Sequence, residues 1–245
     1  MHTSLNMMLN MIGAYGPWAA ALLGDGPARL SFCQPQWRDV DAWRAVARSR
    51  LHECLAAPPL PATPAVESLE QIEFEGLHIE RLRWQLPYGP ATEAALLKPV
   101  GASGPLPGVL GLHCHGGVKF FGKEKIIRLG VAQHPMMRAH QAQYYGGVAW
   151  ANELAKRGYV VLVHDAFPFG SRRVRLSDVP ETMRNGLADP DPGDEAGISA
   201  YNQWAAQHES VMAKSLFCAG VTWPGVFLNE DRIALSVLCA RAEVD

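Results

Sequence analysis

Apolar and polar positions along the chain follow two periods, and together they predict a mixed α/β fold. Residues 108–112 (GVLGL) and 159–164 (YVVLVH) are short apolar runs typical of buried strands. Between them, residues 145–157 carry apolar side chains at helical spacing, and Gly158 ends that pattern. The order strand, helix, strand predicts a βαβ unit with two parallel strands.

Two further strand patterns precede this unit. Residues 71–86 alternate apolar and polar side chains around Gly76, and residues 91–100 form another strand-like run after a PYGP turn. Runs of this kind, joined by short turns, favour antiparallel pairing. We therefore expect antiparallel strands that lead into the parallel ones.

The N-terminal part of the chain has a different character. Residues 39–55 have helical spacing with Asp39 as a cap, and a connector rich in proline follows them. We expect residues 1–64 to form a helical extension with its connector, and residues 65–245 to form the α/β domain. The first residues carry no basic region and no long apolar run, so a leader peptide or membrane span is not expected.

Beyond Asp165, the apolar residues first show no regular spacing and then return to helical spacing. Residues 166–193 contain several Pro and Gly, which predicts a long loop of the kind that is often functional. Residues 194–217 return to helical spacing, and residues 231–240 predict a second helix.

Charge and cysteine content narrow the function classes. The chain has 24 acidic and 22 basic residues with no run of like charge, which argues against a nucleic-acid binder. Its five cysteines include no C-x-x-C pair, which argues against a disulfide framework and a zinc knuckle. We expect a cytoplasmic protein without a cofactor that acts on a small molecule.

Three stretches together resemble the α/β-hydrolase superfamily. They are HCHGG after the first parallel strand, YYGGVAWANELAKRGYVVLVHDAFPFGSRR, and the closing EDRIALSVLCARAEVD. The resemblance covers most of residues 71–245 and is closest to the branch of acetyl xylan esterases and dienelactone hydrolases. It implies that this chain forms the N-terminal part of an α/β-hydrolase sheet.

Such enzymes cleave esters with a Ser on a strand-to-helix elbow, an acid and a His, in that chain order. No G-x-S-x-G occurs in residues 1–245, and in relatives a phrase like RAEVD directly precedes the elbow strand. The resemblance therefore implies a triad beyond Asp245, no catalytic residue within this chain, and no activity of the chain alone. It also implies an open sheet edge where a second copy or a complementing chain would bind.

The resemblance implies a chemical role for the loop after the first parallel strand. In such hydrolases its backbone N–H groups face the oxyanion that forms during acyl transfer. The resemblance therefore makes Gly116 and Gly117 the candidate oxyanion-hole residues. The alternative is that this Gly pair only turns the chain.

Four residues are candidates for the substrate pocket: His115, Asp165, Phe167 and Phe169. Asp165 ends its strand, where functional side chains gather in open α/β sheets, and we expect it to anchor the following loop by hydrogen bonds. The alternative for the two aromatic residues is a place in the core. Between the histidines, Cys114 is either a small buried apolar residue or a thiolate made nucleophilic by a nearby imidazole.

Two other functions remain open. The side chains of His113, His115, His164 and Asp165 are suitable metal ligands, which would make the protein a metal-dependent hydrolase. A complete H-x-H-x-D-H motif is missing, because Gly117 and Val118 occupy its Asp and second His positions. The other possibility is a non-catalytic binding module. The serine-type carboxyl-ester hydrolase, acetyl esterase-like and acting on a small ester, is the preferred hypothesis.

Overall fold

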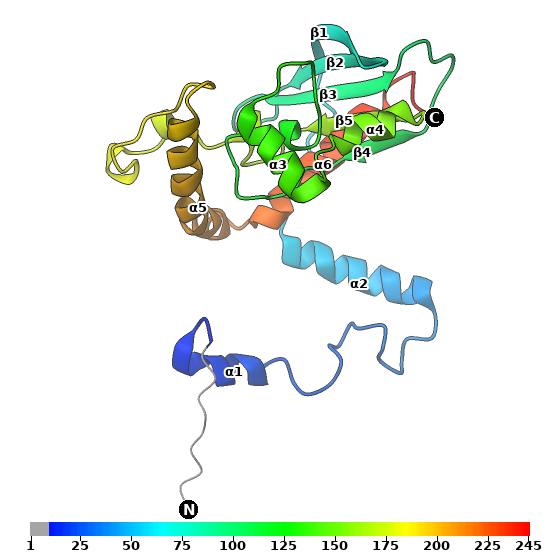
Figure 1. Cartoon of the computed structure of the whole chain (residues 1–245). Coiled ribbons are helices and arrows are strands. Elements are labelled where there is room, and N and C mark those ends of the chain that lie inside the picture. Colours follow the sequence, from blue (N-terminus) through cyan, green and yellow to red (C-terminus); the bar gives the residue numbers. More distant parts are fainter. Residues whose placement is uncertain (1–9) are drawn as a thin grey trace, which may run out of the picture. The chain divides into compact units, whose positions relative to one another are not determined.

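The computed structural model describes residues 10–245, which divide into two compact units: one extends up to Leu55 and one begins at Ala56 (Figure 1). Residues 1–9 lie outside the described residues, and with them lies part of the N-terminal stretch considered above as a leader.

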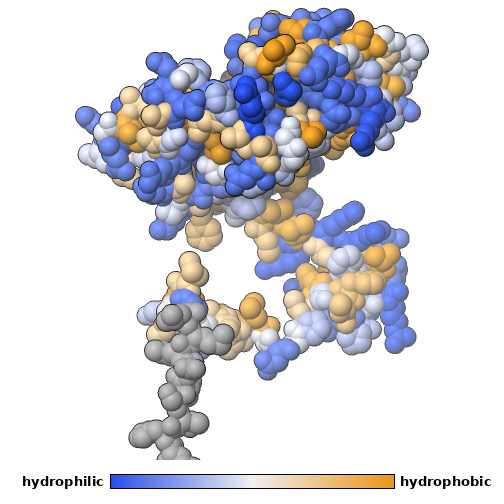
Figure 2. Space-filling view, viewed as in Figure 1, coloured by the Kyte–Doolittle hydropathy of each residue, from blue (hydrophilic) through white to orange (hydrophobic). Residues whose placement is uncertain are grey.

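The N-terminal unit is helical and open. Asp39 caps its longer helix as predicted, because its carboxylate accepts the N–H of Asp41 at 3.0 Å. The Trp43 indole donates to the carbonyl of Leu30 at 2.8 Å, and its ring lies 5.3 Å from that of Phe32. No residue of this helix is buried, and apolar residues of the unit show in orange in Figure 2. Its elements are a 3-10 turn (Gly13–Tyr15), α1 (Gly16–Ala21) and α2 (Val40–Leu55).

The second unit is built on a five-stranded mixed sheet with the order β1-β2-β3-β5-β4. The first four strands in that order pair antiparallel, and β4 pairs parallel with β5. Glu75 and Gly76, with φ of 48° and 77°, make the tight turn between β1 and β2. The predicted antiparallel lead-in and parallel pair are thus confirmed. The strands are β1 (Glu67–Phe74), β2 (Leu77–Trp84), β3 (Thr92–Pro99), β4 (Gly108–Gly111) and β5 (Val160–His164).

Strand β4 lies at the edge of the sheet. Among the described residues, its only neighbouring strand is β5. Just before β4, Leu106 forms a parallel bridge with Val244: its N–H donates to Glu243 and its carbonyl accepts from Asp245, both at 2.9 Å. The last residues of the chain therefore start along the outer edge of β4, parallel to it.

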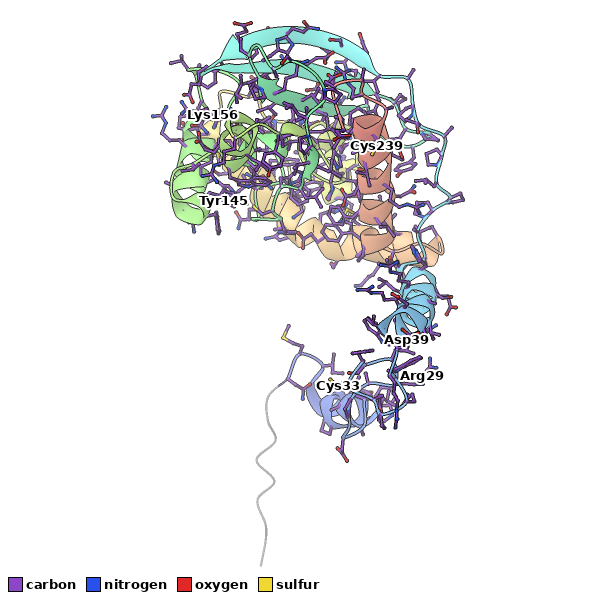
Figure 3. The ribbon with its side chains drawn as sticks, turned by 90° about the vertical axis from the view of Figure 1, so that its right-hand side faces the viewer. Arg29, Cys33, Asp39, Tyr145, Lys156 and Cys239 are labelled. Carbon is purple, nitrogen blue, oxygen red and sulfur yellow. The ribbon has the colours of Figure 1, made fainter. Side chains whose placement is uncertain are left out.

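The connection between β4 and β5 differs from the prediction. The helix expected over residues 145–157 begins only at Trp150, because Gly146 and Gly147 both have positive φ and end the preceding helix. That preceding helix, α3 (Pro135–Tyr145), was not predicted. The crossover helix is α4 (Trp150–Lys156), and a 3-10 turn (Lys123–Lys125) precedes both helices. Figure 3 labels Tyr145 and Lys156 at the ends of α3 and α4.

Two helices close the chain. The first, α5 (Glu195–Cys218), begins where predicted, with the Asp194 carboxylate accepting the N–H of Gly197 at 2.9 Å. The second, α6 (Trp223–Cys239), begins eight residues before the predicted start at 231. Thr222 caps it, and the proline after Trp223 is compatible with its first turn, where no N–H donor is needed. Cys239, labelled in Figure 3, marks its end.

Apolar side chains cover both faces of the sheet. Because side chains alternate along a strand, Leu96 and Leu162 pack with residues of α6, whereas Leu97 and Val161 pack with residues of α4 (Figure 1). The sheet is thus the middle layer between two layers of helix, as expected for an α/β domain.

The segment 166–193 is a long connection, as predicted, but it is well ordered by local bonds. It contains three 3-10 turns, and the Asp189 carboxylate accepts the N–H groups of Leu176 and Ser177, both at 2.9 Å. Leu176 then joins a cluster with Ile198 and Tyr201 of α5. The three turns are Gly170–Arg172, Leu176–Asp178 and Glu181–Met183.

In residues 10–245, no single helix is long and apolar enough to cross a membrane. The helices α5 and α6 reach that measure only when taken together, and they are bent by 83° at the break between them.

Candidate functional site

The HCHGG loop follows β4 at the end where the parallel strand β5 also finishes. Strand β4 ends at Gly111, so His113 and His115 both lie in the loop that follows it. The carboxyl ends of neighbouring parallel strands are the usual place for a binding site in an α/β sheet.

His113 ties this loop to the segment after β5. Its Nδ1 lies 3.2 Å from the carbonyl of Cys114, and its Nε2 accepts the N–H of Ala166 at 3.3 Å. Burial, and then the charge of Lys125, lower the pKa of His113 to about 4. The ring is therefore neutral near pH 7, with its proton on Nδ1, and it serves as a structural link.

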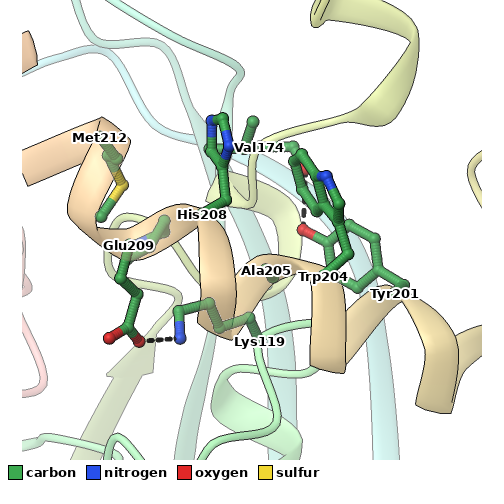
Figure 4. Close-up of a pocket in the computed structure, with 9 residues that line it drawn as sticks. Lys119, Val174, Tyr201, Trp204, Ala205, His208, Glu209 and Met212 are labelled. Atoms are coloured by element: carbon green, nitrogen blue, oxygen red, sulfur yellow. Dashed lines mark hydrogen bonds and ion pairs between the residues drawn. The ribbon is translucent and has the colours of Figure 1, made fainter. Parts of the chain in front are cut away.

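His115 connects the loop to α5. Its Nε2 donates to the Glu209 carboxylate at 2.8 Å, and its Nδ1 accepts the N–H of Gly117 at 3.3 Å. The ammonium of Lys119 also binds Glu209, as Figure 4 shows. Burial raises the pKa of Glu209, but the hydrogen bonds and charges of Lys119 and His115 outweigh it and lower the pKa. An ionised Glu209 thus fixes the tautomer of His115.

The two glycines of the loop adopt a conformation that favours glycine. The φ angles of Gly116 and Gly117 are 49° and 67°. A Cβ on Gly116 would lie 2.6 Å from Cε1 of His140, whereas a Cβ on Gly117 would meet open space. The loop therefore needs the absence of a side chain at Gly116 for its packing as well as for its backbone shape.

Asp165 anchors the segment that follows β5, as predicted. It is fully buried, and its Oδ1 accepts the N–H of Lys123 at 2.7 Å. Its Oδ2 accepts the Lys123 ammonium and the N–H of Ser171, both at 2.9 Å. Burial raises the pKa of Asp165, but the charge and hydrogen bonds of Lys123 dominate and lower it to about 2. Both oxygens of this carboxylate are therefore hydrogen-bonded within the protein.

His164, the last residue of β5, is buried, and both of its ring nitrogens have partners. Its Nε2 lies 3.0 Å from the Asp231 carboxylate on α6, and its Nδ1 lies 3.2 Å from the carbonyl of Asp165. Both ring nitrogens of His113 and His115 likewise have partners. In residues 10–245, no group of three or more His, Cys, Asp or Glu side chains is arranged to hold a metal ion. The four candidate metal ligands from the sequence therefore do not come together as a metal site in the fold.

A cavity of about 190 Å³ lies beside the HCHGG loop. It combines apolar walls with His115 and with the pair formed by His164, at the end of β5, and Asp231, in the middle of α6. Phe169, predicted for the pocket, lines it, and the ring of Phe227 stacks 6.5 Å away. The full set of lining residues is Leu112, His113, His115, His164, Ala166, Phe169, Phe227 and Asp231.

Two of the predicted pocket residues are placed differently. Asp165 is fully buried and does not line the cavity, and it contributes through the bonds described above. Phe167 does not line the cavity, and its N–H donates to Glu230 of α6 at 2.8 Å. Glu230 in turn forms a buried ion pair with Arg172 at 2.6 Å.

A second space, shown in Figure 4, lies between α5 and the segment after β5. Tyr201 and Trp204 form part of its wall, with Lys119 and Glu209 at one end. Its volume is about 10 Å³, which is room for about one water molecule. This second space is therefore too small for a substrate, unlike the cavity of about 190 Å³ beside the HCHGG loop.

Comparison with known proteins supports the same fold. No protein-family model matches the chain. The chain is 32% identical over 130 residues to a Bacillus subtilis protein named "Putative hydrolase YtaP", across 53% of this chain and 40% of that protein. Among solved structures it resembles a Bacteroides fragilis protein described as a "putative acetyl xylan esterase", with a TM-score of 0.63 and 18% identity.

The structural match covers 99% of this chain and 54% of the Bacteroides fragilis protein. The chain thus spans about half the length of these two relatives, or less. The match shows that the chain has the α/β-hydrolase fold of that esterase, which confirms the resemblance seen in the sequence. These matches define the fold of the chain, and its activity is taken up as a proposal below.

Proposed function

We propose that this chain provides the oxyanion loop and one wall of the substrate pocket in a serine-dependent carboxyl-ester hydrolase that is acetyl esterase-like. The Ser, the acid and the His of the triad would lie outside residues 1–245, so the chain alone would be inactive. The substrate would be a small ester, because the cavity beside the loop holds only about 190 Å³.

One observation carries this proposal most directly. The cavity, the HCHGG loop and the carboxyl end of β4 lie together, and residues 243–245 start along the free edge of β4. A parallel strand that continued this pairing would deliver the residue after it to the cavity. That is where an acyl-transfer nucleophile must stand to face backbone N–H donors.

The first test is hydrolysis of a short-chain acyl ester by the purified 245-residue chain, with a serine-directed phosphonate and intact mass as the second readout. We expect neither turnover nor an adduct. Turnover with a Ser adduct would place the nucleophile inside the chain. If turnover occurs without an adduct and a chelator abolishes the turnover, the metal-dependent alternative would be favoured.

A chimera tests the hydrolase class itself. This chain would be followed by the part of the Bacteroides fragilis protein that lies beyond the structural match, and that part alone would be the control. Ester hydrolysis by the chimera, absent from the control, is the expected result. A folded chimera that binds esters without turnover would instead support the non-catalytic binding module.

The proposal extends to partners and location. All five cysteines are free, which supports a reducing, cytoplasmic setting. The open edge of β4 is suited to a complementing chain or a second copy. We propose no nucleic-acid partner, no membrane attachment and no cofactor, which is consistent with the near balance of charges.

A further inference from the structure

A lysine ammonium lies beneath the HCHGG loop and holds two of its carbonyl groups. Nζ of Lys125 donates to the carbonyl of Cys114 at 3.1 Å and to the carbonyl of His115 at 2.9 Å. The side chain is completely buried, and Nζ lies 4.1 Å from the centre of the Phe169 ring. Two carbonyl oxygens and one aromatic face thus surround this cation.

Because the peptide bond is planar, these two contacts also fix the direction of the N–H groups that follow the carbonyls. In a trans peptide the N–H points opposite to the C=O of the same unit. Because the carbonyls of Cys114 and His115 point to Lys125, the N–H groups of His115 and Gly116 point away from it. Both belong to residues that reach the surface of the loop, and no acceptor within residues 10–245 takes either N–H.

The N–H of Gly117 is different. It donates to Nδ1 of His115, whose other nitrogen is bound to Glu209. This donor is therefore satisfied inside the loop, whereas its two predecessors are open.

We infer that the N–H groups of His115 and Gly116 form the anion-binding pair of this site, and that Lys125 is the positioning residue that aims them. The ligand is the oxygen of an ester carbonyl as it gains negative charge, or the carboxylate oxygen of the acid product. This inference rests on the proposed function and replaces the pair Gly116 and Gly117 with the pair His115 and Gly116.

The charge of the lysine makes the arrangement dependent on pH. Burial lowers the pKa of Lys125 to about 8. Below that pH the ammonium holds both carbonyls, and above it the loss of charge weakens both bonds. The other charged or titratable groups that face Lys125 are Lys119, Cys114, Asp165, Glu124, His113 and His140.

The test follows the backbone amide 15N signals of the 13C,15N-labelled chain by carbon-detected NMR, with acetate as the probe at constant ionic strength. Carbon detection is needed because exposed amide protons exchange rapidly with water at high pH. We expect saturable shifts of the His115 and Gly116 signals at about pH 6, and none of comparable size at Gly117. At about pH 10, on the other side of the Lys125 pKa, the same titration should give much weaker shifts.

Variants separate positioning from general stability. Lys125→Met should lose the two selective shifts, Lys125→Arg should restore them in part, and Lys156→Met, at an exposed lysine, should behave as the wild type. If Lys125→Met does not fold, the pH comparison in the wild type decides. The inference is overturned if Gly117 shifts as much as Gly116, if no loop signal responds, or if the response is the same at both pH values. Because acetate binding needs no serine, these results are independent of whether the chimera hydrolyses esters.

Discussion

The carboxylate of Asp165 binds both the backbone N–H and the ammonium of Lys123, at 2.7 and 2.9 Å. One residue at the end of β5 therefore holds the turn that follows the HCHGG loop. A Cβ on Gly122 would lie 2.2 Å from Oδ1 of Asp165, so the glycine before Lys123 allows this approach. The geometry of the loop thus depends on a buried ion pair that does not line the cavity.

Replacement of this carboxylate should be costly. Asp165→Asn leaves the buried Lys123 ammonium with only Glu124 and Glu93, at 3.0 and 3.6 Å, as ionic partners. We expect the free energy of unfolding to fall by about 3 kcal/mol, as for one broken partner of a buried pair. Urea unfolding would measure it. Asp178→Asn, at an exposed position, is the matched control and should change stability by less than about 0.5 kcal/mol.

A second prediction concerns pH. The folded-state pKa of His113 is lowered to about 4, below its unfolded value near 6.5. The unfolded state therefore binds more protons between these values, so stability is lost as pH falls from about 6.5 towards 4. We expect His113 to account for a loss of about 2 kcal/mol in the free energy of unfolding over this range. The value is moderate because the residue is partly rather than fully buried.

Chemical unfolding of the wild type and of His113→Gln at several pH values would test this. The variant should show a flatter dependence of stability on pH over that window. His52→Gln, at an exposed residue of α2, should keep the slope of the wild type. Equal slopes for all three proteins would contradict a His113 that stays neutral in the folded protein.

The strands could be predicted because their signal is local. In β5 all five residues are buried, so the apolar run VVLV was sufficient. Helix α3 was missed because its buried residues include His140 and Gln141 beside Met137, which gives no apolar stripe. The start of α6 was missed because Pro224 and Gly225 read as a break, although a first helical turn accepts both.

The site shows the same division. The HCHGG motif indicated the loop, and Asp165 was found at its strand end. Its long-range partners were not found, because nothing local marks them. Glu209 lies 94 residues from His115, and Lys125 and His140 reach the loop only in the folded chain.

The ion pair between Arg172 and Glu230 leads to a third prediction. These side chains are 1% and 2% exposed, and Glu230 also accepts the N–H of Phe167. Glu230→Gln places an amide where two donors need acceptors, and we expect a loss of about 3 to 5 kcal/mol. Thermal or urea unfolding would measure it. Glu70→Gln, which removes an exposed pair with Arg81 at 3.0 Å, should cost at most about 1 kcal/mol. Similar losses in both variants would mean that Glu230 is not truly buried.

The two loop glycines lead to the last prediction, because they share a backbone conformation but differ in their surroundings. Gly117→Ala should cost about 1 kcal/mol, from the strain of its positive φ alone. Gly116→Ala adds a contact at 2.6 Å with His140 and should cost about 2 to 3 kcal/mol. The double variant Gly116→Ala, His140→Ala removes that contact. Its loss of unfolding free energy should be smaller than the summed losses of the two single variants by at least about 1 kcal/mol. A double-mutant cycle of unfolding free energies measures this coupling. If Gly116→Ala proved as mild as Gly117→Ala and showed no coupling, His140 would not be packed against the loop as described.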